Sequence, residues 1–419
     1  MNAALRIYAR RRVLSMWPLG FASGLPLLLT GSTLSAWLSQ AGLSLSQIGV
    51  LSLLGLPYAL KILWAPLLDR FAIPLLGRRR GWILISQVLL SVCLLLLSRV
   101  SPQQSVSTVA VLALLVAFLS ASQDIVMDAY RTELLRSEER AAGTAVFVFG
   151  YRVAMICSGG LALIVAEHHS FALVYALAAL LLIGGSVLTL RMQETPSVRP
   201  PRTLRSALID PLRDYFGRKS ALQILLFITL YRVGDTLANV MLMPFFLSLH
   251  FTQTEIGVVY KVIGVAATIV GTLLGGLLTV RLGLARALLL FGCGQAAANV
   301  CYSLLALVGK SHTLLALSVG VDHLCTGLAI AALDALLMSL CNRRFSAMQY
   351  ALLVSVSAVL GRVLGGSAGV IANHVGWPLF FFLTAVLSVP AVVLWHYLQP
   401  SIRHGDEDAD GHQVLSGRA

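Results

Sequence analysis

Two aspartates, Asp124 and Asp128, close a long uncharged run of the chain in the stretch SASQDIVMDAY, residues 120 to 130. Four residues separate them, so they share one face if the segment is helical. Two neighbouring carboxylates that are partly removed from water bind a proton more readily than isolated ones. The spacing therefore indicates a proton-binding pair. The alternative is a structural pair that fixes the helix end against Arg131 or Arg152.

Ten charged residues in all lie inside apolar runs of the sequence, with Asp128 at the border of its run. They are Lys61, Asp124, Asp128, Arg152, Arg232, Asp235, Lys261, Asp322, Asp334 and Arg362. An ionised side chain at the centre of a bilayer costs roughly 2.5–3.5 kcal/mol even on a lenient insertion scale. Because ten such charges would oppose folding, we expect them to face a shared, water-filled interior cavity.

Most of the cations in this set have no acid within helical reach on their own segment. Arg232 and Asp235 are three residues apart, so a local ion pair between them is feasible. The cations without such a partner are Lys61, Arg152, Lys261 and Arg362. They either pair across helices or meet an anionic ligand, and arginine favours carboxylates and phosphates.

The composition requires that these residues be carried by membrane-spanning helices. The chain has 419 residues, is 58% hydrophobic and only 12% charged, and its mean hydropathy is +0.84. A water-soluble domain has roughly 25% charged residues, so a soluble globule is excluded. Uncharged runs near the length of a bilayer crossing recur throughout and predict a polytopic α-helical membrane protein, with no cleavable signal peptide. The six cysteines lack metal-ligand spacing, so no metal site is expected.

The apolar runs predict twelve spans. They lie near residues 14–38, 47–68, 82–100, 106–128, 142–166, 170–190, 220–248, 255–280, 286–308, 313–341, 347–371 and 376–398. On this map, 24 of the 31 Lys and Arg fall on one set of tails and loops, and only Arg99 and Lys310 fall on the other side. The positive-inside rule then places both termini and the 191–219 loop in the cytoplasm. The basic charge is therefore a topology signal, and no nucleic-acid partner is expected.

The 191–219 loop divides the chain into two halves of six spans. We expect an N-terminal bundle over 1–190, a cytoplasmic linker over 191–219, a C-terminal bundle over 220–398 and a disordered tail over 399–419. SQIGV (46–50) recurs as TEIGV (254–258), and Asp124, Arg152 and Gly159 recur 210 residues later as Asp334, Arg362 and Gly369. This pattern favours the fold of major facilitator superfamily transporters, with two pseudo-symmetric six-helix bundles and a site at the midplane between them.

Two segments indicate conformational change. The loop PLLDRFAIPLLGRRRGW (66–82) resembles the superfamily's Asp-Arg…Gly-Arg-Arg signature, in which Asp69 can hold an arginine across the domain interface in one state and release it in another. The gating residues predicted here are Asp69, Arg70, Arg78 and Arg79, although the arginines also enforce orientation. In the first span, Gly24 and Pro26 weaken the helix where it would line a cavity. The alternative for such glycines is close helix packing.

Taken together, the motifs resemble the AmpG-type muropeptide permeases of this superfamily. The matching segments are GFASGLP (20–26), LKILWAPLLDR (60–70), GRRRGW (77–82), SASQDIV (120–126), GYR (150–152), PLRDYFGR (211–218), LYRVGD (230–235), IGVVYK (256–261), LLMSLCN (336–342) and FSAMQYALL (345–353). They extend over nearly the whole chain. SQDIVMDA alone is also similar to the acetyl-coenzyme A transporters.

The resemblance implies import of GlcNAc-1,6-anhydro-MurNAc, with or without its peptide, across the inner membrane of Gram-negative bacteria. Such transport is driven by protons and serves peptidoglycan recycling and β-lactamase induction. On this basis Asp124, Asp128 and Asp235 are expected to couple protons. The expected substrate-binding residues are Lys61, Gln123, Tyr151, Arg152, Arg232, Lys261 and Arg362. We expect an anionic sugar-peptide substrate, no cofactor other than the coupling proton, and a monomer in the lipid bilayer.

Three other functions remain open on sequence grounds. The nearest is the same fold carrying another bulky anion, such as an acyl-coenzyme A or a siderophore. A membrane sensor would bind the ligand without moving it, but the largest cytoplasmic stretch is the 191–219 loop, too short for a signalling domain. An enzyme is disfavoured because the chain lacks a Walker loop, a metal-spaced His cluster and a Gly-x-Ser-x-Gly elbow.

Overall fold

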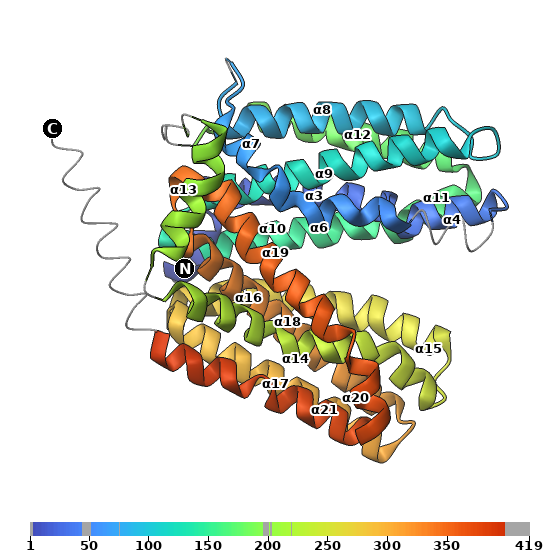
Figure 1. Ribbon diagram of the computed structural model, residues 1–419. Coiled ribbons are helices and arrows are strands. Elements are labelled where there is room, and N and C mark those ends of the chain that lie inside the picture. Colours follow the sequence, from blue (N-terminus) through green and yellow to red (C-terminus); the bar gives the residue numbers. More distant parts are fainter. Residues whose placement is uncertain are drawn as a thin grey trace. The chain divides into compact units, whose positions relative to one another are not determined.

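Helices account for nearly all the regular structure of the chain. The computed structural model describes residues 3–43, 52–74, 76–195, 201, 203–218 and 220–398, and within these ranges the only β-pairing is an isolated bridge between Ile73 and Gly77. The chain forms two compact units (Figure 1). The first comprises Met1–Pro211 with Cys341–Ser355, and the second comprises Leu212–Leu340 with Val356–Ala419. The boundaries near 190 and 220 stay a prediction. The two units differ from the two predicted bundles mainly because residues 341–355 belong to the first unit.

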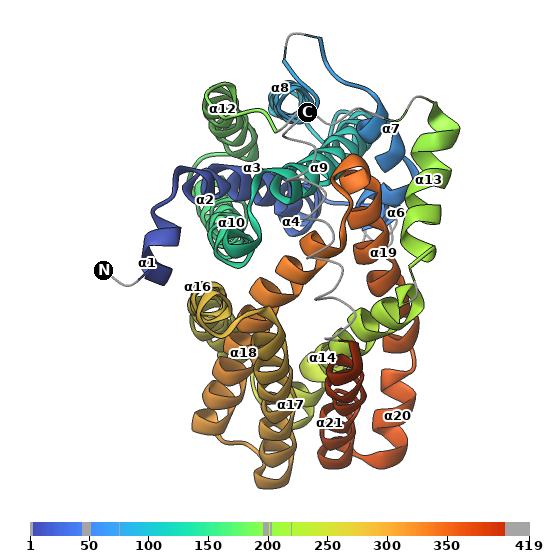
Figure 2. The same cartoon turned by 90° about the vertical axis from the view of Figure 1, so that its left-hand side faces the viewer.

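The first unit is built around five long helices. Its elements are α1 (Ala3–Tyr8), α2 (Arg11–Leu14), α3 (Met16–Leu29), α4 (Ser32–Gln40), η1 (Ser52–Gly55), α6 (Leu56–Leu60), η2 (Lys61–Leu63), α7 (Ala65–Arg70), α8 (Arg79–Leu97), α9 (Val106–Leu134), η3 (Ser137–Glu139), α10 (Arg140–Ile156), η4 (Cys157–Leu161), α11 (Ala162–His168), α12 (Phe171–Leu190) and η6 (Arg343–Phe345). Helix α3 packs along α10, and α8 packs against both α9 and α12. Figure 2 views these helices nearly along their axes.

The second unit contains α14 (Ala221–Ser248), α15 (Gln253–Val258), η5 (Val259–Gly264), α16 (Val265–Leu282), α17 (Leu284–Val308), α18 (His312–Leu340), α20 (Ala368–Val375), α21 (Trp377–Val386) and a helical stretch over 389–398. Helices α13 (Leu204–Phe216) and α19 (Ser346–Gly365) contribute residues to both units. Helix α16 packs along α18, and α17 packs against α18 and α21. An aromatic cluster including Phe245, Phe246, Tyr302 and Phe381 fills the interior of this unit.

Eleven helical segments within the described residues are long and apolar enough to cross a membrane. They are Arg11–Gln40, Arg79–Leu97, Val106–Leu134, Ser137–His168, Phe171–Leu190, Ala221–Ser248, Glu255–Leu282, Leu284–Val308, His312–Leu340, Arg343–Val375 and Trp377–Leu398. The span expected near 47–68 begins in residues outside the described ranges, and from Ser52 it consists of four short segments ending at Arg70. Prolines Pro57 and Pro66 stand at the starts of two of these segments, as expected where a helix must begin again.

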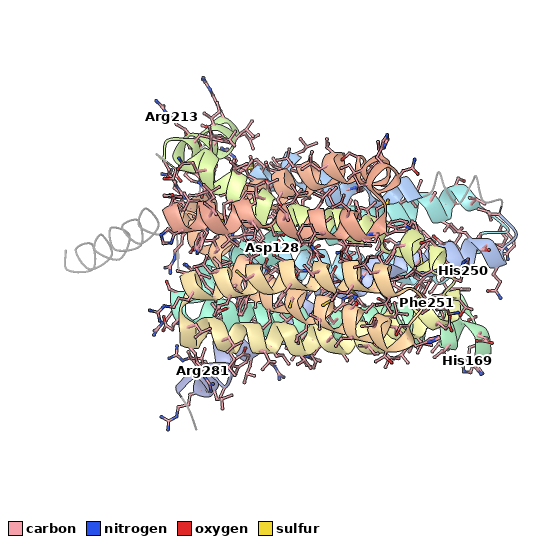
Figure 3. The ribbon with its side chains drawn as sticks, turned by 90° about the horizontal axis from the view of Figure 1, so that it is seen from below. Asp128, His169, Arg213, His250, Phe251 and Arg281 are labelled. Carbon is pink, nitrogen blue, oxygen red and sulfur yellow. The ribbon has the colours of Figure 1, made fainter. Side chains whose placement is uncertain are left out.

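The loop expected over 191–219 contains a helix, α13, although Pro211 lies inside it. In the second unit, Arg281 lies at one end of the helices, and His250 and Phe251 lie at the opposite end (Figure 3). The positive-inside pattern predicts this placement, with Arg281 at the cytoplasmic end. The helix ends that carry arginine are therefore consistent with the predicted cytoplasmic side.

Candidate functional site

Asp124 lies on α9 of the first unit, beside polar side chains of α3, α6, η2 and α10. Its Oδ1 accepts a hydrogen bond of 2.5 Å from the Ser23 hydroxyl. Tyr58, Tyr151 and Lys61 lie close enough to interact with its charge. Within the described part of the chain, Asp124 forms no ion pair. The carboxylate is therefore held by a neutral donor, which is compatible with either protonation state.

Asp128, one turn further along α9, is paired with two cations. Its Oδ1 lies 2.5 Å from Arg131 Nη2, and its Oδ2 lies 3.6 Å from Lys61 Nζ. The Arg131 guanidinium in turn lies over the Phe147 ring, 4.1 Å from its centroid. These contacts favour the structural alternative for Asp128, because two nearby cations stabilise its ionised form.

Arg152 on α10 is a half-buried cation for which the first unit provides no carboxylate among its described residues. Its Nη1 lies 3.6 Å from Met155 Sδ, and its buried Nε has no hydrogen-bond partner there. Tyr151 precedes it and is also half-buried. An unneutralised guanidinium in a membrane-spanning helix is costly, so it is suited to an anionic ligand.

Gln123 points to a neighbouring helix. The side chain is fully buried, and Nε2 donates to the Ala22 carbonyl of α3 at 3.0 Å. This contact fixes α9 against α3 directly beside Ser23 and Asp124. A substrate-binding role for Gln123 stays a prediction, while its positioning role is visible.

Two of the predicted gating residues, Asp69 and Arg78, lie beside a third, Arg79, whose side chain is 0% exposed. Arg79 Nη2 lies 2.6 Å from Asp69 Oδ1 and 2.6 Å from Glu133 Oε1, and Nε donates to Glu133 at 2.9 Å. Arg78 Nη2 also pairs with Glu133, at 2.8 Å. Burial, followed by the positive charge of Arg79, lowers the pKa of Arg78. We call Asp69, Arg78, Arg79, Glu133 and Ser346 the Arg79 network.

Asp69 also accepts hydrogen bonds from the first turn of α19. Its Oδ1 accepts from the Ala347 N–H at 3.3 Å and its Oδ2 from the Met348 N–H at 2.8 Å. A carboxylate at a helix N-terminus satisfies orphan N–H groups and opposes the helix dipole. The acid of the signature loop thus binds an arginine of its own loop and the start of α19, both within the first unit.

Sequence reasoning missed Glu133, which joins three members of this network. Ser346 donates to the same Oε1 at 2.5 Å. The available signal was that Glu133 is one of few acids near a cluster of arginines at the predicted cytoplasmic ends. Arg70, predicted with this group, stacks on Phe71 with its guanidinium 5.3 Å from the ring centroid.

Gly24 and Pro26 lie in α3. A Cβ at Gly24 would lie 2.6 Å from the Tyr151 carbonyl oxygen, so the glycine permits close approach of α3 and α10. The helix containing Pro26 ends at Leu29 and resumes at Ser32. The packing alternative accounts for Gly24; a gating role for either residue stays a prediction.

In the second unit, Asp235 on α14 accepts two amide hydrogen bonds at Oδ1, from Asn239 Nδ2 at 2.8 Å and Gln295 Nε2 at 3.1 Å. Arg232 is exposed and, within the described part of this unit, is not in ion-pair contact with Asp235. The local pair considered from the sequence is therefore not formed. The side chains of Lys261 and Arg362 lie outside the described residues.

A family model described as Major Facilitator Superfamily matches residues 16–366 of the chain. The anhydromuropeptide permease of Escherichia coli strain K12 is 45% identical over 394 residues, which cover 93% of this chain and 80% of that protein. The putative transporter AmpG 4 of Rickettsia conorii is 30% identical over 408 residues, covering 95% and 99% of the two chains. This chain belongs to the AmpG-type permeases of the major facilitator superfamily.

Solved structures of other members of the superfamily share the fold at low identity. The human organic anion transporter MFSD10 matches with a TM-score of 0.66 and 15% identity, covering 94% of this chain and all of that one. The proton:xylose symporter XylE, bound to 6-bromo-6-deoxy-D-glucose, matches with a TM-score of 0.65 and 12% identity, covering 94% and 96%. The predicted fold class and the prediction of a multi-pass transporter rather than an enzyme are confirmed.

Proposed function

We propose that this chain is a proton-coupled importer of anhydromuropeptides. It carries GlcNAc-1,6-anhydro-MurNAc, with or without its peptide, from the periplasm to the cytoplasm by alternating access. It lies in the inner membrane of a Gram-negative bacterium with both termini in the cytoplasm, and it supplies peptidoglycan recycling and the signal for β-lactamase induction.

The observation that carries this proposal is the 45% identity with the Escherichia coli anhydromuropeptide permease over 93% of the chain. Substrate can change within the superfamily fold, so fold similarity alone would not support it. The aligned region covers 93% of this chain and 80% of that protein, so the comparison is not confined to one half of the chain.

The side chains of the first unit are suited to such a substrate. A muropeptide carries several carboxylates, and Arg152 is a half-buried cation with no carboxylate partner among the described residues of its unit. Asp124 lies within electrostatic range of Lys61 and Tyr151 and accepts a hydrogen bond from Ser23. A carboxylate that can gain and lose a proton beside a substrate-binding cation is the arrangement that coupled transport requires.

The test is competition for uptake. Inverted and right-side-out vesicles from cells expressing the chain are given labelled GlcNAc-1,6-anhydro-MurNAc-tripeptide, with matched vesicles lacking the chain as control. Excess unlabelled anhydro-disaccharide should abolish specific uptake, whereas an acyl-coenzyme A or a ferric siderophore should leave it unchanged. Inhibition by either of the latter, with none by the disaccharide, would favour the other bulky anions.

A further inference from the structure

The second unit contains a buried polar site centred on Asp322 of α18. The side chain of Asp322 is almost fully buried, and Tyr302 donates to its Oδ2 at 3.0 Å. Gln295 Nε2 donates to Asp322 Oδ1 at 2.8 Å and to Asp235 Oδ1 at 3.1 Å. One amide nitrogen therefore bridges carboxylates from two helices, α14 and α18. The distance between Asp235 Oδ1 and Asp322 Oδ1 cannot exceed the sum of these two hydrogen-bond lengths.

The orientation of the Gln295 amide indicates which ligand, a proton or a metal ion, can bind between the two carboxylates. Its Oε1 accepts a hydrogen bond from the Thr326 hydroxyl at 3.3 Å, so its two N–H groups face the two carboxylates. A metal cation between the carboxylates would need oxygen ligands, whereas this position is occupied by N–H donors. The arrangement therefore favours a proton on one carboxylate over a bound metal ion.

Asn299 supplies an independent indication of a ligand. Positions 295, 299 and 302 share one face of α17, and the residues on either side of Asn299 both donate to Asp322. Asn299 is 0% exposed, and neither its Nδ2 nor its Oδ1 has a hydrogen-bond partner among the described residues. Leaving a buried amide unpaired is destabilising, so a ligand that both donates and accepts hydrogen bonds would be bound here.

Among the described side chains of this unit, a single cation acts on the two carboxylates. Arg232, one turn before Asp235, is the described cation whose charge acts on the pair. The other described titratable groups whose charges interact with the pair, from η5, α17 and α18, are Tyr260, Cys301, Tyr302 and Cys325. Arg232 can balance one negative charge, and the described side chains provide no further cation for a second, which is costly in a low-dielectric interior.

We propose that Asp322 and Asp235 together bind one transported proton in the second unit, with Gln295 and Tyr302 donating to the pair and Asn299 holding the water that delivers it. Hydronium gives up its proton: one O–H bond of hydronium breaks, one O–H bond forms on a carboxylate oxygen, and water is left at Asn299. This inference rests on the proposed function, and it adds a second coupling site to Asp124.

Infrared difference spectroscopy tests the site without any transport substrate. The full chain in proteoliposomes is titrated with acid, and the C=O stretch of protonated carboxyl groups is followed in H₂O and D₂O. Asp322→Asn and Asp235→Asn should each remove the same single band, and the double variant should remove no more. Asp214→Asn, a carboxylate on α13 outside the spans, is the matched control and should keep it.

Two further variants separate protonation from misfolding. Asp322→Glu should restore the band, and Tyr302→Phe should shift its titration midpoint without removing it. Retention of the full band in Asp322→Asn would overturn the proposal. Displacement of the band by Na⁺ at constant pH would also overturn it, because the site would then bind a metal cation.

Transport measurements distinguish this inference from the proposed function. In Asp322→Asn, gradient-driven accumulation should fall about tenfold, within the range of typical coupling free energies, while exchange is retained. If Asp322→Asn loses the band but the unaltered chain takes up no anhydromuropeptide, the proton site is supported and the proposed function is rejected. Unchanged accumulation and an unchanged band in Asp322→Asn would keep the function and reject the site.

Discussion

At the scale of single residues, Asp124 and Asp128 have opposite surroundings although they lie one helical turn apart. Asp128 is within 4 Å of both Arg131 and Lys61, which stabilise its charge. Asp124 accepts one hydrogen bond from Ser23 and has no ion pair within the described part of the chain. We therefore expect Asp124 to carry the proton and Asp128 to anchor the neighbouring cations.

Asp124→Asn should abolish uphill accumulation and keep exchange of labelled for unlabelled substrate. The amide keeps the hydrogen bond to Ser23 but cannot titrate, so the carrier would cycle without its proton. The measurement is counterflow compared with proton-driven uptake in proteoliposomes. Retained uphill uptake in this variant would refute the assignment.

Arg152→Ala should weaken the binding of peptide-bearing substrates more than the binding of the bare disaccharide. A hydrogen bond between charged groups is worth about 1.5–3 kcal/mol, which corresponds to roughly 10–150-fold in KM for a substrate that carries the matching carboxylate. Arg99→Ala, which removes an exposed loop arginine, is the control and should leave KM unchanged. Equal losses for both substrates would point to a structural role for Arg152.

The sequence predicted residue pairs only where both partners are on one helix. Asp128 and Arg131 are three residues apart, so the alternative that pairs them could be formulated in advance. The Glu133 contacts with Arg78 and Arg79, and the Gln295 bridge to Asp322, join residues of different helices. Such contacts depend on how helices pack, which one sequence without an alignment does not determine.

At the scale of elements, the close approach of α3 and α10 depends on glycines at the contact. A Cβ at Gly20 would lie 1.9 Å from the Phe147 carbonyl oxygen, and one at Gly150 would lie 2.2 Å from that of Trp17. Both positions therefore require glycine, because backbone atoms of the opposite helix cannot move aside. Small residues at helix contacts are the usual means of packing in membranes.

Gly24→Ala should lower the thermal unfolding midpoint of the detergent-solubilised chain, because the added methyl overpacks against the Tyr151 backbone at a cost of about 1–3 kcal/mol. Gly184→Ala in α12 is the matched control. A Cβ there meets no atom within 4 Å, so the midpoint should be unchanged or slightly higher. Equal midpoints for the two variants would contradict the close α3–α10 contact.

Glu133→Gln should destabilise the first unit strongly. Arg79 is fully buried between Asp69 and Glu133, and breaking one side of a buried ion pair costs about 3–5 kcal/mol. Glu138→Gln, which removes an exposed carboxylate paired with Arg10, is the control and should leave the thermal midpoint unchanged. Similar midpoints for the two variants would mean that the Arg79 network is not a structural contact in the membrane.

At the scale of the whole molecule, the distribution of apolar runs and basic loops predicted the fold class because lipid permits few alternatives to the helix. Eleven predicted spans correspond to helical segments, but the segment from Ser52 to Arg70 is divided into short pieces around Pro57 and Pro66. Residues 341–355 belong to the first unit, where the start of α19 donates hydrogen bonds to Asp69 and Glu133. Hydropathy cannot reveal such contacts.

The most direct test of the account is simultaneous measurement of proton and substrate flux in proteoliposomes containing the purified chain. Labelled GlcNAc-1,6-anhydro-MurNAc-tripeptide is supplied outside, and internal pH is followed with a trapped dye at zero membrane potential. We predict that the inward substrate gradient carries protons into the vesicles and that an imposed inward proton gradient concentrates the substrate inside. Substrate that merely equilibrates under the imposed gradient, with no proton movement, would contradict the account.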